Sequence, residues 1–286
     1  MDGLIAAGAY YASSKSRVTL KNLDRKRTIF ITGAASGIGL ATAKLFLHQG
    51  WFVGCFDTNV GKLESLFSDL ESDCCLGEID VTVGSSCQHA IEKFMQATKG
   101  HFDVLFNCAG ILRIGQLCDF ALEEQIAQIK VNCVGVTNVT YMALPYLESS
   151  KGRIVSMSSL SAVAGVANHA VYSATKAFVS SFTEAIRSEG RVLCCDVAAP
   201  YVDTPMTDSQ KISLPGSAFN KKSAFIGPED VANKVWEAVY HCSFYNEHFY
   251  CGRVEIVFRL VALSRSLGLN LHTNMIHKGS GMSSRI

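Results

Sequence analysis

The chain contains 286 residues, of which 48% are hydrophobic and 18% charged, and its formal net charge is +1. This length and hydrophobic content favour one large domain with a substantial buried core. The near-neutral charge gives no reason to expect a nucleic-acid partner, and no apolar run reaches the ~18 residues that a membrane-spanning helix requires.

The eleven cysteines are odd in number, include no Cys-x-x-Cys and show no metal-ligand spacing. Several lie in apolar, strand-like runs, where a thiol behaves as a small hydrophobe. We therefore expect neither a metal site nor a disulfide framework, and we assign the chain to a reducing compartment, the cytoplasm.

Residues 1–27 are interpreted as an N-terminal extension. The apolar stretch from Gly3 to Ala12 is followed, not preceded, by basic residues, which is the reverse of a signal peptide. A loosely packed extension is the favoured interpretation, and an organelle-targeting or surface-associating arm is the alternative.

The first element of the domain is a short β-branched run at 28–32, which predicts a buried parallel strand. It leads into a glycine turn and then a helix over 40–49. Gly33 permits a tight turn, Gly37 lets backbone approach a pyrophosphate, and Gly39 allows close helix packing. A strand, glycine turn and helix in this order predict a dinucleotide site, in which the anion lies at the helix N-terminus.

Asp57 follows the second predicted strand, 51–56. A carboxylate at this position accepts hydrogen bonds from the adenosine ribose and repels a 2′-phosphate. Neither Lys nor Arg occurs between Gly33 and Gly39 or just after Asp57. The sequence therefore predicts NAD(H) and disfavours NADP(H), although Asp57 could also cap the helix that follows.

Strand and helix patterns continue to alternate along the chain. The further strands are predicted at 74–79, 102–106, 153–157, 192–198 and 247–251, and the helices at 62–70, 85–97, 120–147 and 170–189. This alternation predicts an α/β fold: a single doubly wound Rossmann-type domain over 28–252, with a parallel seven-stranded sheet flanked by helices.

Tyr172 and Lys176 are four residues apart in the helix predicted over 170–189, so their side chains share one face. A neighbouring ammonium stabilises a phenolate, which predicts a tyrosine pKa lowered toward working pH and a general acid/base. Taken alone, the pair also fits a half-buried tyrosine beside a solvated lysine. Asn132, inside a predicted helix, fits an exposed or backbone-bonded residue when taken alone.

Two segments near the C-terminus do not fit the strand and helix alternation. Residues 203–227 are rich in polar residues and are interpreted as a substrate lid. Residues 253–286 are interpreted as an amphipathic helix and tail. Such a helix packs on its own domain or a neighbouring subunit, or rests peripherally on a membrane.

These features stand in one order along the chain: Thr32-Gly33-x-x-x-Gly37-Ile38-Gly39, Asp57, Asp80-Val81, Asn107-Cys108-Ala109-Gly110, Asn132, Ser159, Tyr172-x-x-x-Lys176 and Pro200…Thr204. In this order they match the motifs of the short-chain dehydrogenase/reductase family, which the chain resembles over roughly residues 28–251. The resemblance implies that the catalytic positions are Asn132, Ser159, Tyr172 and Lys176. It implies that the cofactor lies against Gly33, Ala35, Ser36, Gly37, Ile38, Gly39, Asp57, Thr58, Asp80, Val81, Asn107, Ala109, Gly110, Tyr172, Lys176, Pro200, Val202, Thr204 and Met206.

The resemblance also implies a mechanism. Ser159 would hold the substrate oxygen and Tyr172 would exchange a proton with it, while hydride passes between the substrate carbon and the nicotinamide. Lys176 would lower the tyrosine pKa and hold the ribose, and Asn132 would position a water for proton relay. Relatives of this kind imply a homodimer or homotetramer. Two positions depart from the pattern: Tyr201 replaces a glycine, and Cys108 replaces Asn or Ala.

The expected substrate pocket is more apolar than polar. Its candidate residues are Ser161, Val163, Gly165, His169, Tyr201, Met206 and Phe225. We therefore expect a NAD(H)-dependent alcohol dehydrogenase or ketone reductase acting on a small hydrophobic substrate such as a sterol, terpenoid or retinoid. A non-redox isomerase, cyclase or dehydratase with bound NAD is the alternative, and a non-catalytic binding protein is a third interpretation.

Overall fold

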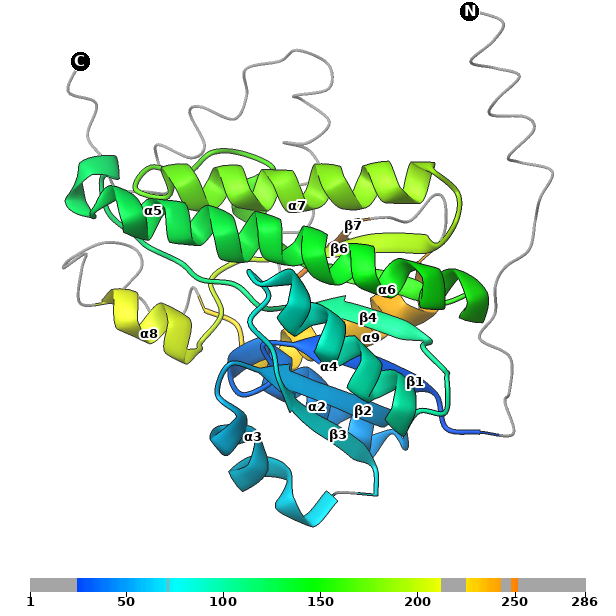
Figure 1. Cartoon of the computed structure of the whole chain (residues 1–286). Helices are drawn as coiled ribbons and strands as arrows, with labels where there is room; N and C mark the ends of the chain where they lie inside the picture. The colour runs from blue at the N-terminus through cyan, green and yellow to red at the C-terminus, as the bar shows by residue number, and fades with distance from the viewer. Residues whose placement is uncertain (1–24, 71, 212–224, 243–247, 252–286) are drawn as a thin grey trace, which may run out of the picture.

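Seven parallel strands form one sheet in the computed structural model, which describes residues 25–70, 72–211, 225–242 and 248–251 (Figure 1). Their order is β3-β2-β1-β4-β5-β6-β7, and every neighbouring pair is parallel. The strands are β1 Thr28–Thr32, β2 Phe52–Asp57, β3 Cys74–Glu78, β4 Val104–Asn107, β5 Arg153–Ser159, β6 Leu193–Ala199 and β7 His248–Tyr250. The predicted doubly wound, seven-stranded sheet is confirmed, and its order reverses between β1 and β4, where such sheets bind ligands.

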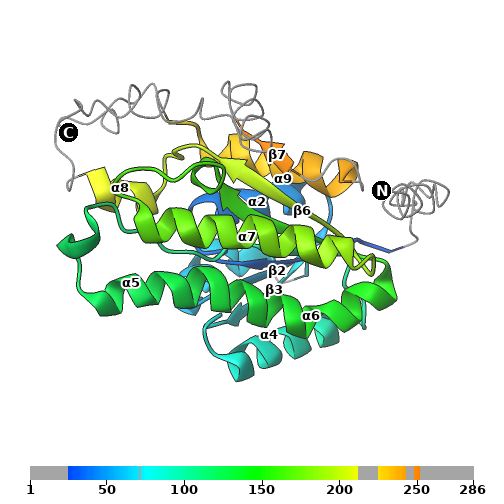
Figure 2. The ribbon, with the colours of Figure 1, turned by 90° about the horizontal axis from the view of Figure 1, so that it is seen from above.

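Helices cover both faces of the sheet, so the strands are buried between two layers (Figure 2). The α-helices are α2 Gly37–His48, α3 Val60–Phe67, α4 Gly84–Ala97, α5 Leu122–Ile129, α6 Val136–Ser150, α7 Ala170–Ser188, α8 Pro205–Lys211 and α9 Pro228–His241. Helices α2, α3 and α9 contribute to one apolar core, and α4, α6 and α7 to the core on the opposite face. Continuous apolar strands such as β1, whose five residues are all buried, are what such a two-sided sheet requires.

Aromatic side chains fill both cores. Phe30 stacks on Phe56 with ring centroids 4.3 Å apart on one face, and Phe46 packs against Trp236 on the other. Eight of the eleven cysteines are buried: Cys55, Cys74, Cys75, Cys87, Cys194, Cys195, Cys242 and Cys251. These thiols contribute to the core as small hydrophobes.

Two segments differ from the sequence-based expectation. The single helix expected over 120–147 is interrupted by a π-helical turn, η3, at Lys130–Gly135. The polar segment expected as a lid begins with a helix, α8, which starts at Pro205, a favoured first helical residue. Ile226 then pairs with Val202 in a short parallel bridge. Residues 212–224 of the expected lid lie outside the described residues.

The end of the expected N-terminal extension contacts the domain. Arg25 forms a bidentate ion pair with Asp103, at 2.7 and 2.8 Å, and Lys26 pairs with Asp73. Residues 1–24, and the amphipathic helix expected over 253–286, lie outside the described residues. Within the described part of the chain, no helix is long and apolar enough to cross a membrane.

Candidate active site

The predicted site residues converge at the carboxyl edge of the sheet. Each strand from β1 to β6 ends at or just before one of them: Gly33, Asp57, Asp80, Asn107, Ser159 and Pro200. Residues spread over more than 160 positions of sequence are therefore brought to one edge, where open parallel sheets bind their ligands.

The glycine turn between β1 and α2 has little room for side chains. Gly33 and Gly37 have φ values of 72° and 51°, which favour glycine. A Cβ at Gly39 would lie 2.1 Å from the carbonyl oxygen of Gly33, and one at Gly33 would lie 3.0 Å from Ala109 Cα. Ser36, the N-cap of α2, makes no capping bond with its side chain, so the helix N-terminus presents its first amides to an anion.

Asp57 is tied to the glycine turn by a hydrogen bond. Its Oδ2 accepts from the amide of Ala35 at 3.0 Å, and its Oδ1 accepts from the amide of Asn59 at 3.0 Å. Thr58 is exposed beside it, and Ile38 packs on the core below the turn. The carboxylate is thus held next to the turn, where an adenosine ribose would lie.

The loop after β4 is held against β1 by a threonine. Thr32 Oγ1 accepts hydrogen bonds from the amides of Cys108 and Ala109, both at 3.0 Å. Asn107 Nδ2 donates to Thr140 Oγ1 at 3.0 Å, while its Oδ1 is buried with no hydrogen-bond partner among the described residues. The substitution by Cys108 leaves this backbone arrangement intact.

Asn132 lies in the π-helical turn η3 and is only 1% exposed. Its Oδ1 accepts from the Ile111 amide at 2.9 Å, and its Nδ2 donates to the Ile111 carbonyl at 2.9 Å and to Thr175 Oγ1 at 3.1 Å. Both amide hydrogens are therefore in use. The side chain joins the loop after β4 to helix α7, and π turns of this kind often occur at functional sites.

Ser159 ends β5; its hydroxyl donates to the Ala199 carbonyl at 3.5 Å and lowers the pKa of the nearby Tyr172 phenol. Ser159 Oγ also accepts from the amide of Ser161 at 3.2 Å and from its hydroxyl at 2.9 Å. Ser161, which the sequence places in the substrate pocket, therefore orients the Ser159 hydroxyl.

Lys176 and Tyr172 both contribute to the same site, as their helical spacing predicts. Lys176 Nζ lies 5.7 Å from the centroid of the Tyr172 ring and donates to the Met157 carbonyl at 2.8 Å. A Cβ at Gly110 would lie 3.2 Å from Asn132 Oδ1 and 3.7 Å from Lys176 Nζ. The four predicted catalytic residues are thus collected around the loop after β4.

The pKa of Tyr172 differs from the expectation. Burial raises it to about 12, against an opposing influence of the Ser159 hydroxyl, so the predicted lowering by Lys176 is wrong for this arrangement. The ammonium is directed at a backbone carbonyl rather than at the phenol oxygen, and burial lowers the pKa of Lys176 to about 8. At neutral pH the site therefore holds a protonated phenol beside an ammonium.

An apolar and aromatic wall lies beside Tyr172. Leu112 and Ile114 are buried there against the partly buried rings of Tyr172, Tyr201 and Phe225. The Tyr201 and Phe225 rings stack with centroids 5.7 Å apart. Two predicted pocket residues, Tyr201 and Phe225, are thus brought together beside Tyr172.

His169 contributes a polar contact to this wall. Its Nδ1 lies 2.9 Å from the Ala167 carbonyl, so Nδ1 carries the hydrogen and Nε2 accepts from the Tyr201 hydroxyl at 3.4 Å. Burial lowers the pKa of His169, which favours this neutral form. The His169 and Tyr172 rings lie 6.3 Å apart, edge to face.

The segment after β6 lies against the glycine turn. A Cβ at Gly37 would lie 3.1 Å from Thr204 Cγ2, so Thr204 adjoins the expected cofactor path. Val202 is buried, and Met206, expected to face both cofactor and substrate, is 37% exposed at the start of α8. Pro200 is partly buried at the end of β6.

Asp80, Val81 and Gly165, three further predicted residues, have different surroundings. Asp80 Oδ1 accepts from the amide and the hydroxyl of Thr82, at 2.9 and 2.7 Å, and so stabilises its own turn. Val81 is buried beside Gly135 of the π turn. Gly165 is exposed, and no atom lies within 4 Å of a Cβ built there.

The sequence analysis assigned no role to the threonines that hold the site together. Thr32, Thr140 and Thr175 bond to the loop after β4, to Asn107 and to Asn132, respectively. Thr32 and Thr175 stand beside recognised residues in the sequence, which was the one signal that could have identified them.

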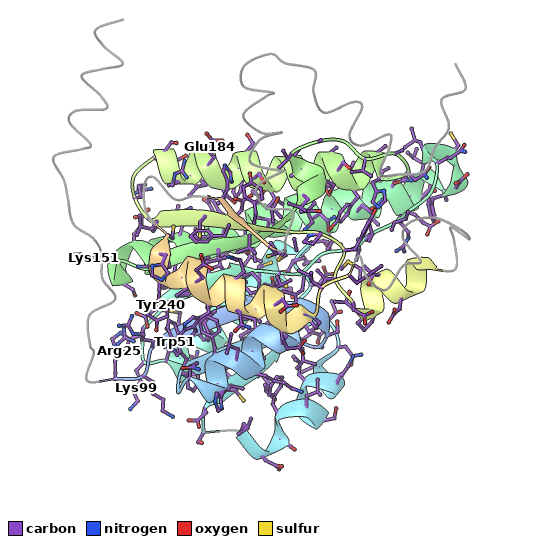
Figure 3. The ribbon with its side chains drawn as sticks, turned by 180° about the vertical axis from the view of Figure 1, so that it is seen from behind. Arg25, Trp51, Lys99, Lys151, Glu184 and Tyr240 are labelled. Carbon is purple, nitrogen blue, oxygen red and sulfur yellow. The ribbon has the colours of Figure 1, made fainter. Side chains whose placement is uncertain are left out.

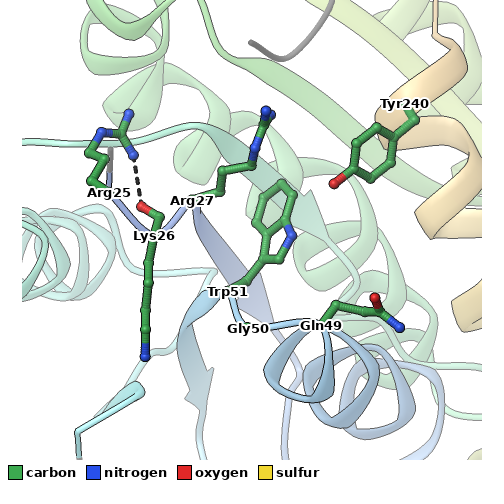
Figure 4. A pocket seen from close by; sticks show the side chains of 7 residues that line it. All are labelled: Arg25, Lys26, Arg27, Gln49, Gly50, Trp51 and Tyr240. Atoms are coloured by element: carbon green, nitrogen blue, oxygen red, sulfur yellow. Dashed lines mark hydrogen bonds between the residues drawn. The ribbon is translucent and has the colours of Figure 1, made fainter. Parts of the chain in front are cut away.

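A second hollow lies at the opposite end of the sheet. It has a volume of about 530 Å³ and is lined by Arg25, Lys26, Arg27, Gln49, Gly50, Trp51 and Tyr240 (Figure 4). Figure 3 shows Arg25, Trp51 and Tyr240 at the end of the molecule away from α8. Because Arg25 and Lys26 are neutralised by aspartates, we assign no chemistry to this hollow.

No group of three or more potential metal ligands occurs among the described residues.

Comparison with known proteins agrees with this geometry. Residues 27–213 match the family described as short chain dehydrogenase. A 3-oxoacyl-acyl-carrier-protein reductase, FabG of Thermotoga maritima, is 35% identical over 220 residues, which are 73% of this chain and 88% of the relative. A 3-ketodihydrosphingosine reductase of Bacteroides thetaiotaomicron is 33% identical over 196 residues, 65% of this chain and 67% of the relative.

Solved structures share the fold. A short-chain dehydrogenase/reductase from Burkholderia phymatum in complex with NAD superposes with a TM-score of 0.74 at 21% identity, covering 91% of this chain and 98% of that one. ElxO with NADP bound gives a TM-score of 0.71 at 21% identity, covering 82% and 100%. The chain belongs to the short-chain dehydrogenase family and has its Rossmann-type fold, as the motifs predicted.

Proposed function

We propose that this chain is a NAD(H)-dependent oxidoreductase that interconverts an apolar secondary alcohol and its ketone, with Tyr172 as general acid/base. The observation that supports this most strongly is the placement of Tyr172, whose ring centroid lies 5.7 Å from Lys176 Nζ and whose phenol pKa the nearby Ser159 hydroxyl influences. A strand-end hydroxyl and a phenol close together can hold one substrate oxygen and exchange a proton with it.

The protonated phenol of Tyr172 is the form that reduction of a ketone uses. Burial keeps the Tyr172 phenol protonated at neutral pH, so it can donate its proton to the carbonyl oxygen while Ser159 holds that oxygen. The reduced nicotinamide, when bound, supplies the hydride that forms the new C–H bond. Lys176, whose pKa is about 8, is largely protonated at pH 7, so its positive charge lies 5.7 Å from the centroid of the Tyr172 ring when the phenolate forms. Oxidation of the alcohol is the reverse.

Asn132 is assigned a scaffolding role in this mechanism. Its amide bonds to Ile111 and Thr175 occupy both of its hydrogens, which leaves only Oδ1 to accept a bond from a water. We infer that it holds the loop after β4 against α7 and so fixes the distance from Gly110 to Lys176. The proton relay suggested by the family resemblance would then need a water on Oδ1 or on backbone carbonyls.

The residues present fit a nicotinamide dinucleotide. The glycines let the turn pack closely where a Cβ would clash, and no side-chain cap occupies the α2 N-terminus, so its first amides are available to a phosphate. Asp57, held on the Ala35 amide, would accept the ribose hydroxyls and repel a 2′-phosphate. These observations support NAD(H) over NADP(H).

The wall beside Tyr172 supports a hydrophobic substrate. Leu112, Ile114 and Phe225 offer no side-chain hydrogen bond, and Tyr201 directs its hydroxyl at His169. Tyr201, which replaces the glycine of the family pattern, narrows the pocket with its ring. A ring alcohol, retinoid or long-chain 3-oxo compound would present an apolar surface to this wall, and the two reductases named above make the last class a natural candidate.

The test uses purified protein, NAD⁺ or NADH, and a panel of apolar alcohols and ketones that includes a sterol, a retinoid, a terpenoid and a 3-oxoacyl thioester. We expect NADH absorbance at 340 nm to change in proportion to product with at least one pair. Product formation without a stoichiometric change in NADH would contradict an oxidoreductase and favour a non-redox isomerase, cyclase or dehydratase.

The outer face of α5, α6 and α7 supports a homo-oligomer. Large apolar side chains are exposed along it: Leu122, Ile126, Ile129, Val134, Tyr141, Tyr146 and Phe178. The two helical runs lie side by side (Figure 2), and we infer that these exposed side chains gather in a patch of the kind that marks an interface. We expect a homodimer or homotetramer in solution, and Ile129→Glu should dissociate it in light scattering measurements.

A further inference from the structure

A polar cluster lies beneath α7, on the side of the sheet that this helix covers. Asp196, in the middle of β6, is 2% exposed and is the register partner of Ser156 on β5 and of His248 on β7. Register partners point to the same face. His248 Nδ1 lies 2.5 Å from Asp196 Oδ1, and Ser180 of α7 donates to Asp196 Oδ2 at 2.5 Å.

The cluster continues to the catalytic end of β5. Ser158 is two residues beyond Ser156 and therefore on the same face. Its Oγ lies 2.7 Å from Ser180 Oγ and 3.3 Å from the carbonyl oxygen of Lys176. A line of hydrogen bonds thus runs from a buried carboxylate to the peptide of Lys176, through the residue that precedes Ser159.

The carboxylate sets the direction of these bonds. An ionised Asp196 can only accept, so the single hydroxyl proton of Ser180 goes to it. Ser180 Oγ must then accept from Ser158, whose own proton is shared between Ser180 and the Lys176 carbonyl. The charge on Asp196 therefore orients two serine hydroxyls that lie between the sheet and α7.

His248 balances this charge. The hydrogen bond and charge of Asp196 raise the pKa of His248, with smaller contributions from Glu184, which raises it, and Arg187, which lowers it. Both of these charged residues are on α7, and Figure 3 shows Glu184 on that helix. A buried carboxylate is costly to a fold, and well-packed apolar residues often stabilise it better, so its presence here calls for a role beyond stability.

Both the side chain and the backbone of Lys176 form hydrogen bonds with β5. Its Nζ donates to the Met157 carbonyl at 2.8 Å, and its own carbonyl accepts from Ser158. We propose that Asp196 is a positioning residue, which acts through two serine hydroxyls to hold the Lys176 turn of α7 against the end of β5. The proposal rests on the proposed function, in which Lys176 and Tyr172 must keep a set distance from Ser159.

Two variants of Ser180 separate positioning from packing. Ser180→Thr and Ser180→Val have nearly the same shape, and only the first retains a hydroxyl. Ser188→Ala is the matched control, because Ser188 lies on the same helix and its Oγ bonds only to the exposed Glu184 carbonyl. Asp196→Asn keeps the shape of the carboxylate and removes its charge.

Two measurements are made on the full chain. The first is the dissociation constant of NADH from fluorescence. The second is the pH dependence of acetic anhydride labelling of Lys176 by mass spectrometry, which needs no cofactor. We expect Ser180→Val and Asp196→Asn to weaken NADH binding by roughly fivefold, the loss expected for one hydrogen bond. We also expect them to displace the midpoint of Lys176 labelling, while Ser180→Thr and Ser188→Ala stay close to the wild type.

The outcomes distinguish the two proposals. If Ser180→Thr and Ser180→Val give the same labelling midpoint, the hydroxyl does not position Lys176 and the inference is overturned. If the wild type binds neither NADH nor NADPH, the proposed function fails, and the labelling midpoints still decide the inference. If Ser180→Val does not fold, the Lys176 labelling midpoints of the wild type, Asp196→Asn and Ser180→Thr are compared instead. Equal midpoints in all three would overturn the inference.

Discussion

Asn132→Ala tests the scaffolding role of the π-helical turn. The side chain makes three hydrogen bonds, at 2.9, 2.9 and 3.1 Å, two of them to the Ile111 backbone. At about 1 kcal/mol for each bond, the substitution should lower the free energy of unfolding by about 2–3 kcal/mol. For a domain of this size that corresponds to a fall in Tm of roughly 5–10 °C.

Asn138→Ala is a matched control for this substitution. Asn138 lies in α6, directly after the π turn, is partly buried, and makes one bond of this kind, from Nδ2 to the Val81 carbonyl at 3.0 Å. Asn138→Ala should lower the free energy of unfolding by only about 1 kcal/mol. Thermal unfolding followed by circular dichroism, together with NADH fluorescence, measures stability and cofactor affinity for both variants.

The two variants should also differ in cofactor binding. Loss of Asn132 releases the loop from Gly110 to Ile111 that lies over Lys176, so NADH affinity should fall about tenfold or more. Asn138→Ala should leave that affinity unchanged. Equal losses of stability and equal NADH affinities in the two variants would refute the assignment of Asn132 as the residue that holds this loop.

Three further predictions follow from the site. Asp57→Ala should reduce the preference for NADH over NADPH by about tenfold or more, because it removes the charge that repels a 2′-phosphate; an unchanged ratio of dissociation constants would show that Asp57 does not set the preference. Gly39→Ala should abolish NADH binding or folding, since its Cβ would lie 2.1 Å from the Gly33 carbonyl oxygen. The control Gly61→Ala, in α3, places its Cβ with no atom within 4 Å, so it should raise the free energy of unfolding by about 0.5–1 kcal/mol. Burial lowers the pKa of Lys176 from its usual 10.5 to about 8, so folding releases a proton between these values and the stability from this group rises with pH across them. Lys176→Met should therefore be more stable than the wild type by roughly 1–3 kcal/mol at pH 7, with the difference shrinking above about pH 8 and vanishing only by about pH 11; a constant difference in urea unfolding would contradict the lowered pKa.

The layout of the sheet could be predicted because each strand carries its own local signal. β1 was predicted at its observed bounds, Thr28–Thr32, since a β-branched run before a glycine turn defines both ends. The π turn at Lys130–Gly135 has no such signal: its residues continue a helical pattern, and the interruption comes from the contacts of Asn132 with Ile111 and Thr175. The helix at Pro205 was missed because the polar residues that follow it resemble a loop.

The electrostatics of the site could be predicted only in part. Spacing alone placed Tyr172 beside Lys176, but it could not show that both groups would be buried or that the ammonium would be directed at the Met157 carbonyl. Burial, which is set by the whole fold, reversed the expected direction of the tyrosine pKa. The contact of Asp196 with His248, 52 residues apart, depends on strand register and likewise has no local signal.

The most direct test of the proposed mechanism is Tyr172→Phe, which removes one hydroxyl from the site. With a substrate pair identified from the panel of alcohols and ketones, the variant should bind NADH with the affinity of the wild type and lose turnover by at least about a thousandfold, because the general acid/base is gone. Ser159→Ala should show the same separation between binding and turnover. Turnover by Tyr172→Phe at the wild-type rate would contradict the role of Tyr172 as the general acid/base.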